Sequence, residues 1–277
     1  MSVVITKREM YKAALVFVVV GNAATAIPSS GPLPKGPELE HFLRTASIES
    51  MTPIGVGITK PMKVRLTDGE RSLHAVWKSV DEHRHGVHRG RGGGYQNSFK
   101  DSYKYEVAAY ELDKLLDLGL VPPTVERKIE GRKGSLQLWI EDGFTELDRR
   151  EKGLEPSDAV AWSNEIYKWR LLQQLTYNDD AHNLRNVLYD RGFRVYAIDN
   201  SRSFRRFHAL VNASELRRFS RSVLERLAML TRSELERNLS PWLQGVEIDA
   251  LLARRDLILD RADTLAADVG TDKIFYP

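Results

Sequence analysis

The sequence contains no cysteine, which excludes disulfide bonds, thiolate–zinc sites and cysteine nucleophiles. It also lacks a strong charge of one sign, because 41 basic and 38 acidic residues give a net charge of +3. So small an excess does not predict a nucleic-acid partner. The chain of 277 residues is 42% hydrophobic and 29% charged, which is typical of a folded globular protein. Its length suits one large domain or two lobes that share a cleft, and we expect a monomer.

Long hydrophobic runs are scarce, and the clearest one, Ala13–Val20, lies near the N-terminus. Basic residues precede it and an A-T-A triplet ending at Ala26 follows it, which is the order of an export signal. The run is too short to cross a bilayer, so no transmembrane segment is predicted beyond the signal. We predict a signal peptide over residues 1–26, a Pro-rich extended lead-in over 27–44, and an exported (periplasmic or secreted) protein. The alternative is a buried first strand or helix of a cytoplasmic protein.

The remainder of the N-terminal half shows strand patterns around one helix. Residues 45–80 alternate apolar and polar side chains around an Asp-Gly turn, which predicts a small antiparallel sheet. Residues 81–96 are rich in Gly, His and Arg without periodicity, so we predict a mobile basic loop. The irregular spacing of its histidines does not favour a metal site. Residues 102–120 have helical spacing that stops near Gly119, and two further strands follow.

The second half is mainly helical. An amphipathic run begins after Ser157, a candidate N-cap. We therefore predict an α+β, two-lobed fold, in which a small antiparallel sheet lobe with one helix (45–142) precedes a mainly α-helical lobe (143–277). Starts of the later helices are predicted near Ser214, Thr231 and Glu247.

The first lobe carries groups that suit a nucleotide. Phosphoryl transfer needs a cover over the phosphates, a cation, a carboxylate for the acceptor hydroxyl and metal ligands. Gly55 and Gly57 lie between two strands, where glycine permits close backbone approach to phosphate, although an ordinary hairpin turn is the alternative. Lys78 ends a strand and can reach a cleft. Glu106, early in the next helix, can pair with it, and Glu111 is the competing partner.

A hinge between the lobes is predicted at Ser135–Gly143. Its backbone, around Gln137 and Trp139, could bind the edge of an adenine ring. A core strand with Trp139 packed inside is the alternative.

Residues 178–204, "NDDAHNLRNVLYDRGFRVYAIDNSRSF", combine carboxylates and amides with a predicted hairpin. Asp180 is the candidate that orients the acceptor hydroxyl, and Asn186 or Asn183 would help to hold a metal. The hairpin then delivers Asp199 at the end of a strand. Oxygen ligands of this kind suit Mg²⁺. A polar Asx-rich turn followed by a surface hairpin is the alternative.

Four stretches together resemble the atypical kinase-like fold of phosphatidylinositol 3-/4-kinases, HipA-type kinases and the secretory-pathway casein kinase of the Golgi. They are "HAVWK", "YEVAAYELDKLLDLGLVPPTVER", "YNDDAHNLRN" and "AIDNSRSFR". The resemblance covers about residues 54–204 and is nearest to bacterial members of unassigned role. It implies a two-lobed protein-kinase-like fold that binds ATP and Mg²⁺ and phosphorylates a protein or small-molecule hydroxyl. The resemblance implies that the roles in phosphate binding, orientation of the acceptor and metal binding described above belong to Lys78, Glu106, Asp180, Asn186 and Asp199.

One departure from the resemblance concerns spacing. The metal-binding Asn usually follows the catalytic Asp by five residues, whereas Asn186 follows Asp180 by six and Arg185 occupies the expected position. The alternative to an active kinase is therefore a catalytically inactive pseudokinase that acts as a nucleotide-binding or interaction module. A third hypothesis is a metal-dependent hydrolase that uses Asp180, His182 and Asp199.

Overall fold

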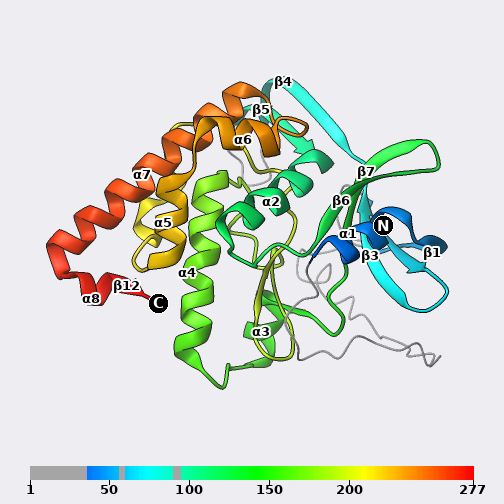
Figure 1. Ribbon diagram of the computed structural model, residues 1–277, viewed down its shortest axis with the longest axis horizontal. Helices are drawn as coiled ribbons and strands as arrows, with labels where there is room; N and C mark the ends of the chain where they lie inside the picture. Colours follow the sequence, from blue (N-terminus) through cyan, green and yellow to red (C-terminus); the bar gives the residue numbers. More distant parts are fainter. Residues whose placement is uncertain (1–35, 56–59, 90–94) are drawn as a thin grey trace, which may run out of the picture.

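The computed structural model describes residues 36–55, 60–89 and 95–277. The predicted signal peptide, the first half of the predicted lead-in and Gly57 lie outside the described residues. The described chain forms a β-rich N-terminal lobe and a mainly helical C-terminal lobe, with helix α2 (Tyr103–Leu116) contacting both (Figure 1). The predicted α+β class is confirmed.

The N-terminal lobe is built on a five-stranded antiparallel sheet with the strand order β1-β2-β3-β7-β6. Side chains alternate along each strand, so Leu73, Ala75 and Trp77 of β3 are buried on one face. Lys78 and the other intervening residues of β3 lie on the opposite face. The strands are β1 (Ser47–Pro53), β2 (Met62–Thr67), β3 (Ser72–Lys78), β7 (Arg132–Leu138) and β6 (Thr124–Ile129).

Helix α1 (Pro37–Thr45) packs against the apolar face of this sheet. The prediction of an extended lead-in is wrong for these residues. Pro37 stands in the first turn, where its missing N–H has no helical partner to lose. Leu39, Phe42 and Leu43 then recur on one side of the helix and join the core of the sheet.

In the described part of residues 81–96, where a loop is predicted, the chain forms strands instead: β4 (Asp81–Arg89) pairs with β5 (Tyr95–Ser102) in a two-stranded antiparallel hairpin. Its ladder depends on backbone hydrogen bonds, which form without apolar alternation, so the composition gave no strand signal. The base of the hairpin is fixed, because the Ser102 hydroxyl donates to Asp81 Oδ1 at 2.7 Å. The hairpin therefore leads directly into α2.

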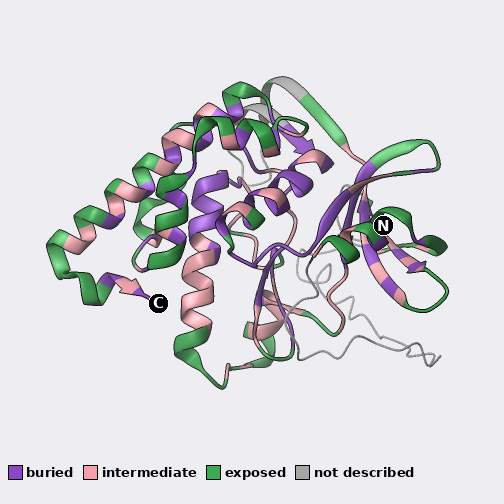
Figure 2. Cartoon of the chain, viewed as in Figure 1, coloured by how far each residue is buried: buried purple, intermediate pink, exposed green. Residues whose placement is uncertain are grey.

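Helix α2 begins and ends at clear caps. The Ser102 hydroxyl accepts from the Lys104 N–H, and Asp117 ends the helix in the left-handed conformation at φ 51°. The helix therefore stops two residues before the predicted Gly119. Buried residues cover most of its circumference, as expected for a helix between two lobes (Figure 2).

The C-terminal lobe packs its helices around one apolar core, which includes α4 (Ala159–Thr176) and the long helix α7 (Gly245–Val269). A three-stranded sheet, β10-β9-β8, lies beside them and contains the predicted hairpin. The remaining elements are α3 (Glu146–Lys152), β8 (Phe144–Thr145), β9 (Val187–Tyr189), β10 (Val195–Ala197), η1 (Ala213–Glu215), β11 (Phe219–Ser220), α5 (Arg221–Met229), α6 (Arg232–Leu239), α8 (Thr271–Ile274) and β12 (Phe275–Tyr276).

Several helix starts differ from the prediction. Asp158, not Ser157, caps α4, because its carboxylate accepts from the N–H groups of the second and third helical residues. Ser214 lies inside a short 3₁₀ turn capped by Asn212. Thr231 caps α6 as predicted. Helix α7 starts after Gln244, which forms a capping box with Glu247.

Within residues 36–55, 60–89 and 95–277, none of the helices combines the length and the apolar character needed to cross a bilayer.

Candidate active site

The candidate site is centred on Lys78 at the end of β3. Its ammonium Nζ lies 2.6 Å from Glu106 Oε1 and 2.8 Å from Asp199 Oδ1. Glu111, the competing partner, instead pairs with Lys114 at 3.0 Å. One strand, one helix and the segment after β10 therefore meet at a single ammonium group.

The charges at this point perturb one another. Burial would lower the pKa of Lys78, but the carboxylates of Asp199 and Glu106 outweigh it and raise that pKa well above its usual range. Burial raises the pKa of Glu106, which is 1% exposed, while Lys78 opposes that rise. Lys78 lowers the pKa of Asp199, whose side chain is 43% exposed. Lys78 is therefore protonated, and Asp199 is an ionised carboxylate open to solvent.

Glu106 also holds the segment that carries Asp199. Its Oε2 accepts a hydrogen bond from the Asn200 N–H at 3.0 Å, while Oε1 accepts from Lys78. Asp199 has a left-handed backbone at φ 59°, a conformation that is costly for a non-glycine residue and persists only where the surroundings fix it. The role of Asn200 is missed from the sequence, because its contribution is a backbone N–H that any residue other than proline supplies.

The predicted catalytic loop follows α4 and folds as successive tight turns. The Asp180 N–H donates to the Asn178 side chain, which is buried. The Asn183 N–H donates to the Asp180 carbonyl at 3.0 Å, and the Asn186 N–H donates to the Asn183 carbonyl at 2.9 Å. These two three-residue steps return Asn186 to Asp180, so the six-residue spacing is compatible with direct contact between the two side chains.

Both asparagines contact the same carboxylate oxygen. The side-chain amides of Asn183 and Asn186 each donate to Asp180 Oδ2 at 3.1 Å. Asn186 is buried, and its carbonyl accepts from the Ile198 N–H at 3.2 Å, next to Asp199. Asn186 therefore lies beside the strand end that presents Asp199, which favours it over Asn183 as the partner of that residue.

Asp179, the other carboxylate of the loop, is engaged elsewhere. Its Oδ2 pairs with Arg205 Nε at 3.0 Å, and its N–H donates to the Arg202 carbonyl at 3.5 Å. Burial raises its pKa, although the nearby arginines oppose that effect. Asp179 therefore joins the loop to the segment after Asp199.

The groups predicted to contact adenine, at Gln137 and Trp139, already have hydrogen-bond partners within the protein. Gln137 is buried and its amide donates to Thr124 Oγ1 at 2.9 Å. The Trp139 N–H donates to the His74 carbonyl at 2.9 Å, so this donor is already used. Strand register pairs Lys78 with Ser135, which places Ser135 and Gln137 on the same face of the sheet as Lys78.

The Gly-containing turn is described only in part. Gly55 has φ 78°, a left-handed conformation that glycine adopts without strain, just after β1. Gly57 lies outside the described residues.

The oxygen atoms of Asp199 and Asn186 match the ligand preference of Mg²⁺, which uses one or two carboxylates together with substrate phosphates. In the described part of the chain, His, Asp and Glu side chains form no group of three or more that could hold a metal ion. His182 is exposed on the surface of the loop. The hydrolase hypothesis, which needs Asp180, His182 and Asp199 as a metal cluster, is therefore not supported.

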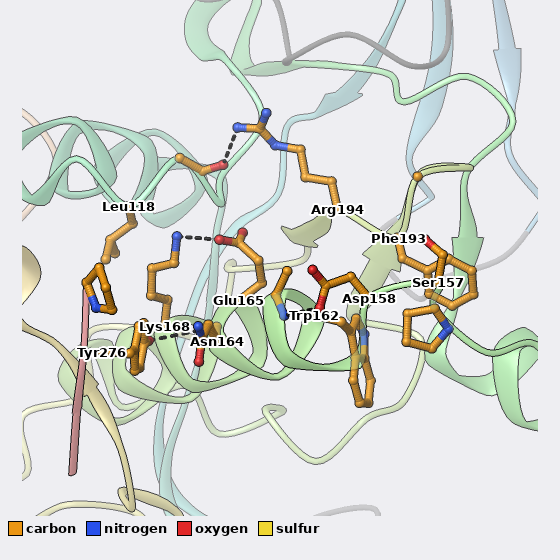
Figure 3. Close-up of a pocket in the computed structure, with 15 residues that line it drawn as sticks. Leu118, Ser157, Asp158, Trp162, Asn164, Glu165, Lys168, Phe193, Arg194 and Tyr276 are labelled. Atoms are coloured by element: carbon orange, nitrogen blue, oxygen red, sulfur yellow. Dashed lines mark hydrogen bonds and ion pairs between the residues drawn. The ribbon is translucent and has the colours of Figure 1, made fainter. Parts of the chain in front are cut away.

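A separate cavity of about 540 Å³ lies beside the first half of α4 (Figure 3). None of the predicted site residues lines it. Its polar groups largely bond one another: Lys168 pairs with Glu165, Tyr276 donates to the Asn164 carbonyl and Arg194 donates to the Gly119 carbonyl. The cavity is thus distinct from the candidate site.

The arrangement is that of the two-lobed atypical kinase-like fold. Solved structures with the same fold include hydra Fam20 with sugar, at a TM-score of 0.65 and 16% identity over 86% of this chain and 91% of that one. The Golgi casein kinase with Mn/ADP bound aligns at a TM-score of 0.61 and 14% identity, over 86% of this chain and 78% of that one. The Helicobacter pylori proinflammatory kinase CtkA aligns at 0.51 and 10% identity, over 82% and 97%. Comparisons with protein-family models and with curated protein sequences find no match.

Proposed function

We propose that the protein is an ATP- and Mg²⁺-dependent phosphotransferase of the atypical kinase type, which transfers the γ-phosphoryl group to a protein or small-molecule hydroxyl. The observation that carries this proposal is the placement of Lys78 Nζ between Glu106 and Asp199. A lysine fixed by a helix carboxylate and set beside an exposed aspartate is the arrangement that phosphate and metal require. The Mn/ADP bound to the Golgi casein kinase of the same fold supports the choice of ligand.

Each residue has a distinct task in the proposed reaction. Lys78 binds phosphate oxygens, and Glu106 keeps its ammonium group in place. Asp199 and Asn186 would hold Mg²⁺, which neutralises negative charge on the phosphates when bound. Asp180, held by two amides, orients the acceptor hydroxyl and accepts its proton. Catalysis then comes from positioning and electrostatic stabilisation.

The competing function is a nucleotide-binding module without transferase activity. It is favoured by one observation, that two amide groups already donate to the same oxygen of Asp180. Those donors occupy lone pairs of the carboxylate that an acceptor hydroxyl would otherwise contact.

A thermal-shift titration with ATP and Mg²⁺ tests the site, with Asp199→Ala as the control. A ligand at 100 times its Kd that binds only the folded state adds about 2.7 kcal/mol of stability. The wild-type melting temperature should rise and that of Asp199→Ala should rise far less. No shift at millimolar nucleotide would exclude both functions.

Asp180→Asn separates the two functions. In an active kinase it should keep the thermal shift and lose about 10²- to 10⁴-fold in the rate of γ-phosphate transfer, measured with radiolabelled ATP. Wild-type protein that binds nucleotide but transfers no phosphate to water, to itself or to an acceptor mixture would favour the binding module.

A further inference from the structure

A buried polar cluster joins α2 to the start of α7. Glu247, in the first turn of α7, is 1% exposed. Its Oε1 accepts from the Tyr105 hydroxyl at 2.6 Å and from the Lys100 ammonium, which comes from β5. Its Oε2 accepts from the Gln244 N–H at 2.8 Å. One carboxylate therefore fixes the end of the hairpin and the first turn of α2 to the C-terminal lobe.

Tyr105 directly precedes Glu106 on α2. Consecutive side chains on an α-helix diverge by about 100°, so the two point to different sides of the helix. Tyr105 reaches toward α7, whereas Glu106 reaches toward Lys78 and the Asn200 N–H. Because both side chains belong to α2, the hydrogen bond from Tyr105 to Glu247 fixes the rotation of this helix about its axis. It thereby fixes the direction of Glu106.

We propose that Tyr105 and Glu247 are positioning residues, which hold α2 in the rotation that keeps Glu106 against Lys78. This inference rests on the proposed function for its catalytic meaning, but the geometry it concerns is a property of the protein without nucleotide. The Tyr105 ring also lies 5.7 Å from that of Phe204, in the segment that follows Asp199. We call the Tyr105–Glu247 contact the anchor. It joins α2 to the C-terminal lobe, and through Phe204 it also contacts the segment that follows Asp199.

The structure dictates which variant tests this idea. Burial lowers the pKa of Lys100, so removal of the Glu247 carboxylate would leave a buried ammonium without its partner and destabilise the whole protein. Tyr105→Phe removes one hydroxyl, which also accepts from the Lys100 ammonium, but it leaves the Lys100–Glu247 ion pair in place. It therefore releases the anchor without stranding a charge.

The same helix supplies a matched control. The Tyr110 hydroxyl donates to Glu40 Oε1 at 3.2 Å, and that carboxylate keeps Lys114 at 2.9 Å when the hydroxyl is removed. Tyr105 and Tyr110 are both buried, and each donates to a glutamate that also binds a lysine. The Tyr110 contact, however, runs to α1 in the N-terminal lobe. Tyr110→Phe should have a similar effect on melting temperature without affecting the rotation of α2 against α7.

Hydrogen exchange at the Asn200 amide provides a readout that needs no nucleotide. This N–H donates to Glu106 Oε2, so its exchange reports whether Glu106 is in place. Tyr105→Phe should accelerate exchange there by about fivefold, within the range expected for a positional coupling, and Tyr110→Phe should not. Equal exchange in the two variants would overturn the proposal.

A coupling measurement then tests the link to the site. In a titration with ATP and Mg²⁺, Tyr105→Phe should weaken nucleotide affinity by about fivefold in the wild-type background and leave it unchanged in Glu106→Gln. An equal loss in both backgrounds would mean that Tyr105 does not act through Glu106. If the wild-type protein binds no nucleotide, the proposed function fails, while the exchange at Asn200 still decides whether the anchor positions Glu106.

Discussion

Lys78 Nζ lies 2.6 Å from Glu106 Oε1 and 2.8 Å from Asp199 Oδ1, although these partners are 28 and 121 residues away in the sequence. The ammonium therefore joins β3, α2 and the segment after β10 in one charged contact. Two carboxylates approach each other because the cation lies between them, so removal of the cation should change how they ionise.

Lys78→Met should make thermal stability depend strongly on pH. Without the ammonium, burial and Asp199 raise the pKa of Glu106 further. A raised folded-state pKa adds stability below the unfolded value of about 4.3, and this stability is lost as the pH rises through the folded pKa. The melting temperature of Lys78→Met, followed by circular dichroism, should therefore fall as the pH rises from about 4.3 into the neutral range.

The wild-type protein should change less over this interval, because Lys78 opposes the rise in the pKa of Glu106. The lowered pKa of Asp199 adds stability that is lost only at acid pH, below about 4, and the raised pKa of Lys78 adds stability that is lost only above about 10. The double variant Lys78→Met/Glu106→Gln is the control, because it lacks the titrating group. A pH slope that survives in the double variant would assign the titration to another residue.

The two asparagines of the catalytic loop should differ in their effect on metal binding. Asn186 is buried and bonded to the backbone next to Asp199, whereas Asn183 is only half-buried. We expect Asn186→Ala to lower the apparent Mg²⁺ affinity, measured at fixed nucleotide, by about 10- to 100-fold. Asn183→Ala should stay within about twofold of wild type. The reverse order would make Asn183 the metal ligand.

The sequence predicted the Lys78–Glu106 pair and Asp199 because each depends on residue type at the end of a regular element. It could not choose between Asn183 and Asn186. That choice depends on two successive three-residue turns, which bring Asn186 back to Asp180 although it is six residues further along the chain.

Other features have no local signal in the sequence. The β4-β5 hairpin depends on a backbone ladder without apolar alternation, so its composition resembled that of a loop. The Tyr105–Glu247 contact joins residues 142 apart in the sequence, and nothing near either residue indicates the other. Long-range pairing of this kind follows from the packing of the lobes and not from periodicity.

Gly134→Ala should weaken the strand pairing that carries Lys78. A Cβ at Gly134 would collide with the Lys78 carbonyl and would lie 2.6 Å from Trp77 Nε1. We expect a loss of about 1–3 kcal/mol in the free energy of unfolding, measured by urea denaturation, and weaker nucleotide binding. Gly192→Ala is the control, since its nearest neighbour would be Asp190 Oδ1 at 3.3 Å. Equal losses in the two variants would contradict this steric explanation.

Arg254, at the middle of α7, holds the base of the predicted catalytic loop. It is 0% exposed, and its guanidinium donates to the Leu175 carbonyl at 2.8 Å and to the carbonyls of Arg205 and Phe207. Burial lowers its pKa to about 10, and within the described residues no carboxylate lies within 4.0 Å of it to form an ion pair. Main-chain dipoles from both sides of the loop thus stabilise this buried charge.

Arg254→Met should therefore destabilise the protein by about 3 kcal/mol, because it leaves buried carbonyls without donors. Arg127→Met is the control, since the half-exposed Arg127 guanidinium likewise donates to carbonyls, those of Leu43 and Ala46, but in the N-terminal lobe. Arg127→Met should lower the free energy of unfolding by about 1 kcal/mol. Urea denaturation measures both values. Phosphotransferase activity per folded molecule should fall in Arg254→Met alone, because only its carbonyl partners flank Asp180 and Asp199. Unchanged activity per folded molecule in Arg254→Met would show that Arg254 merely stabilises the fold.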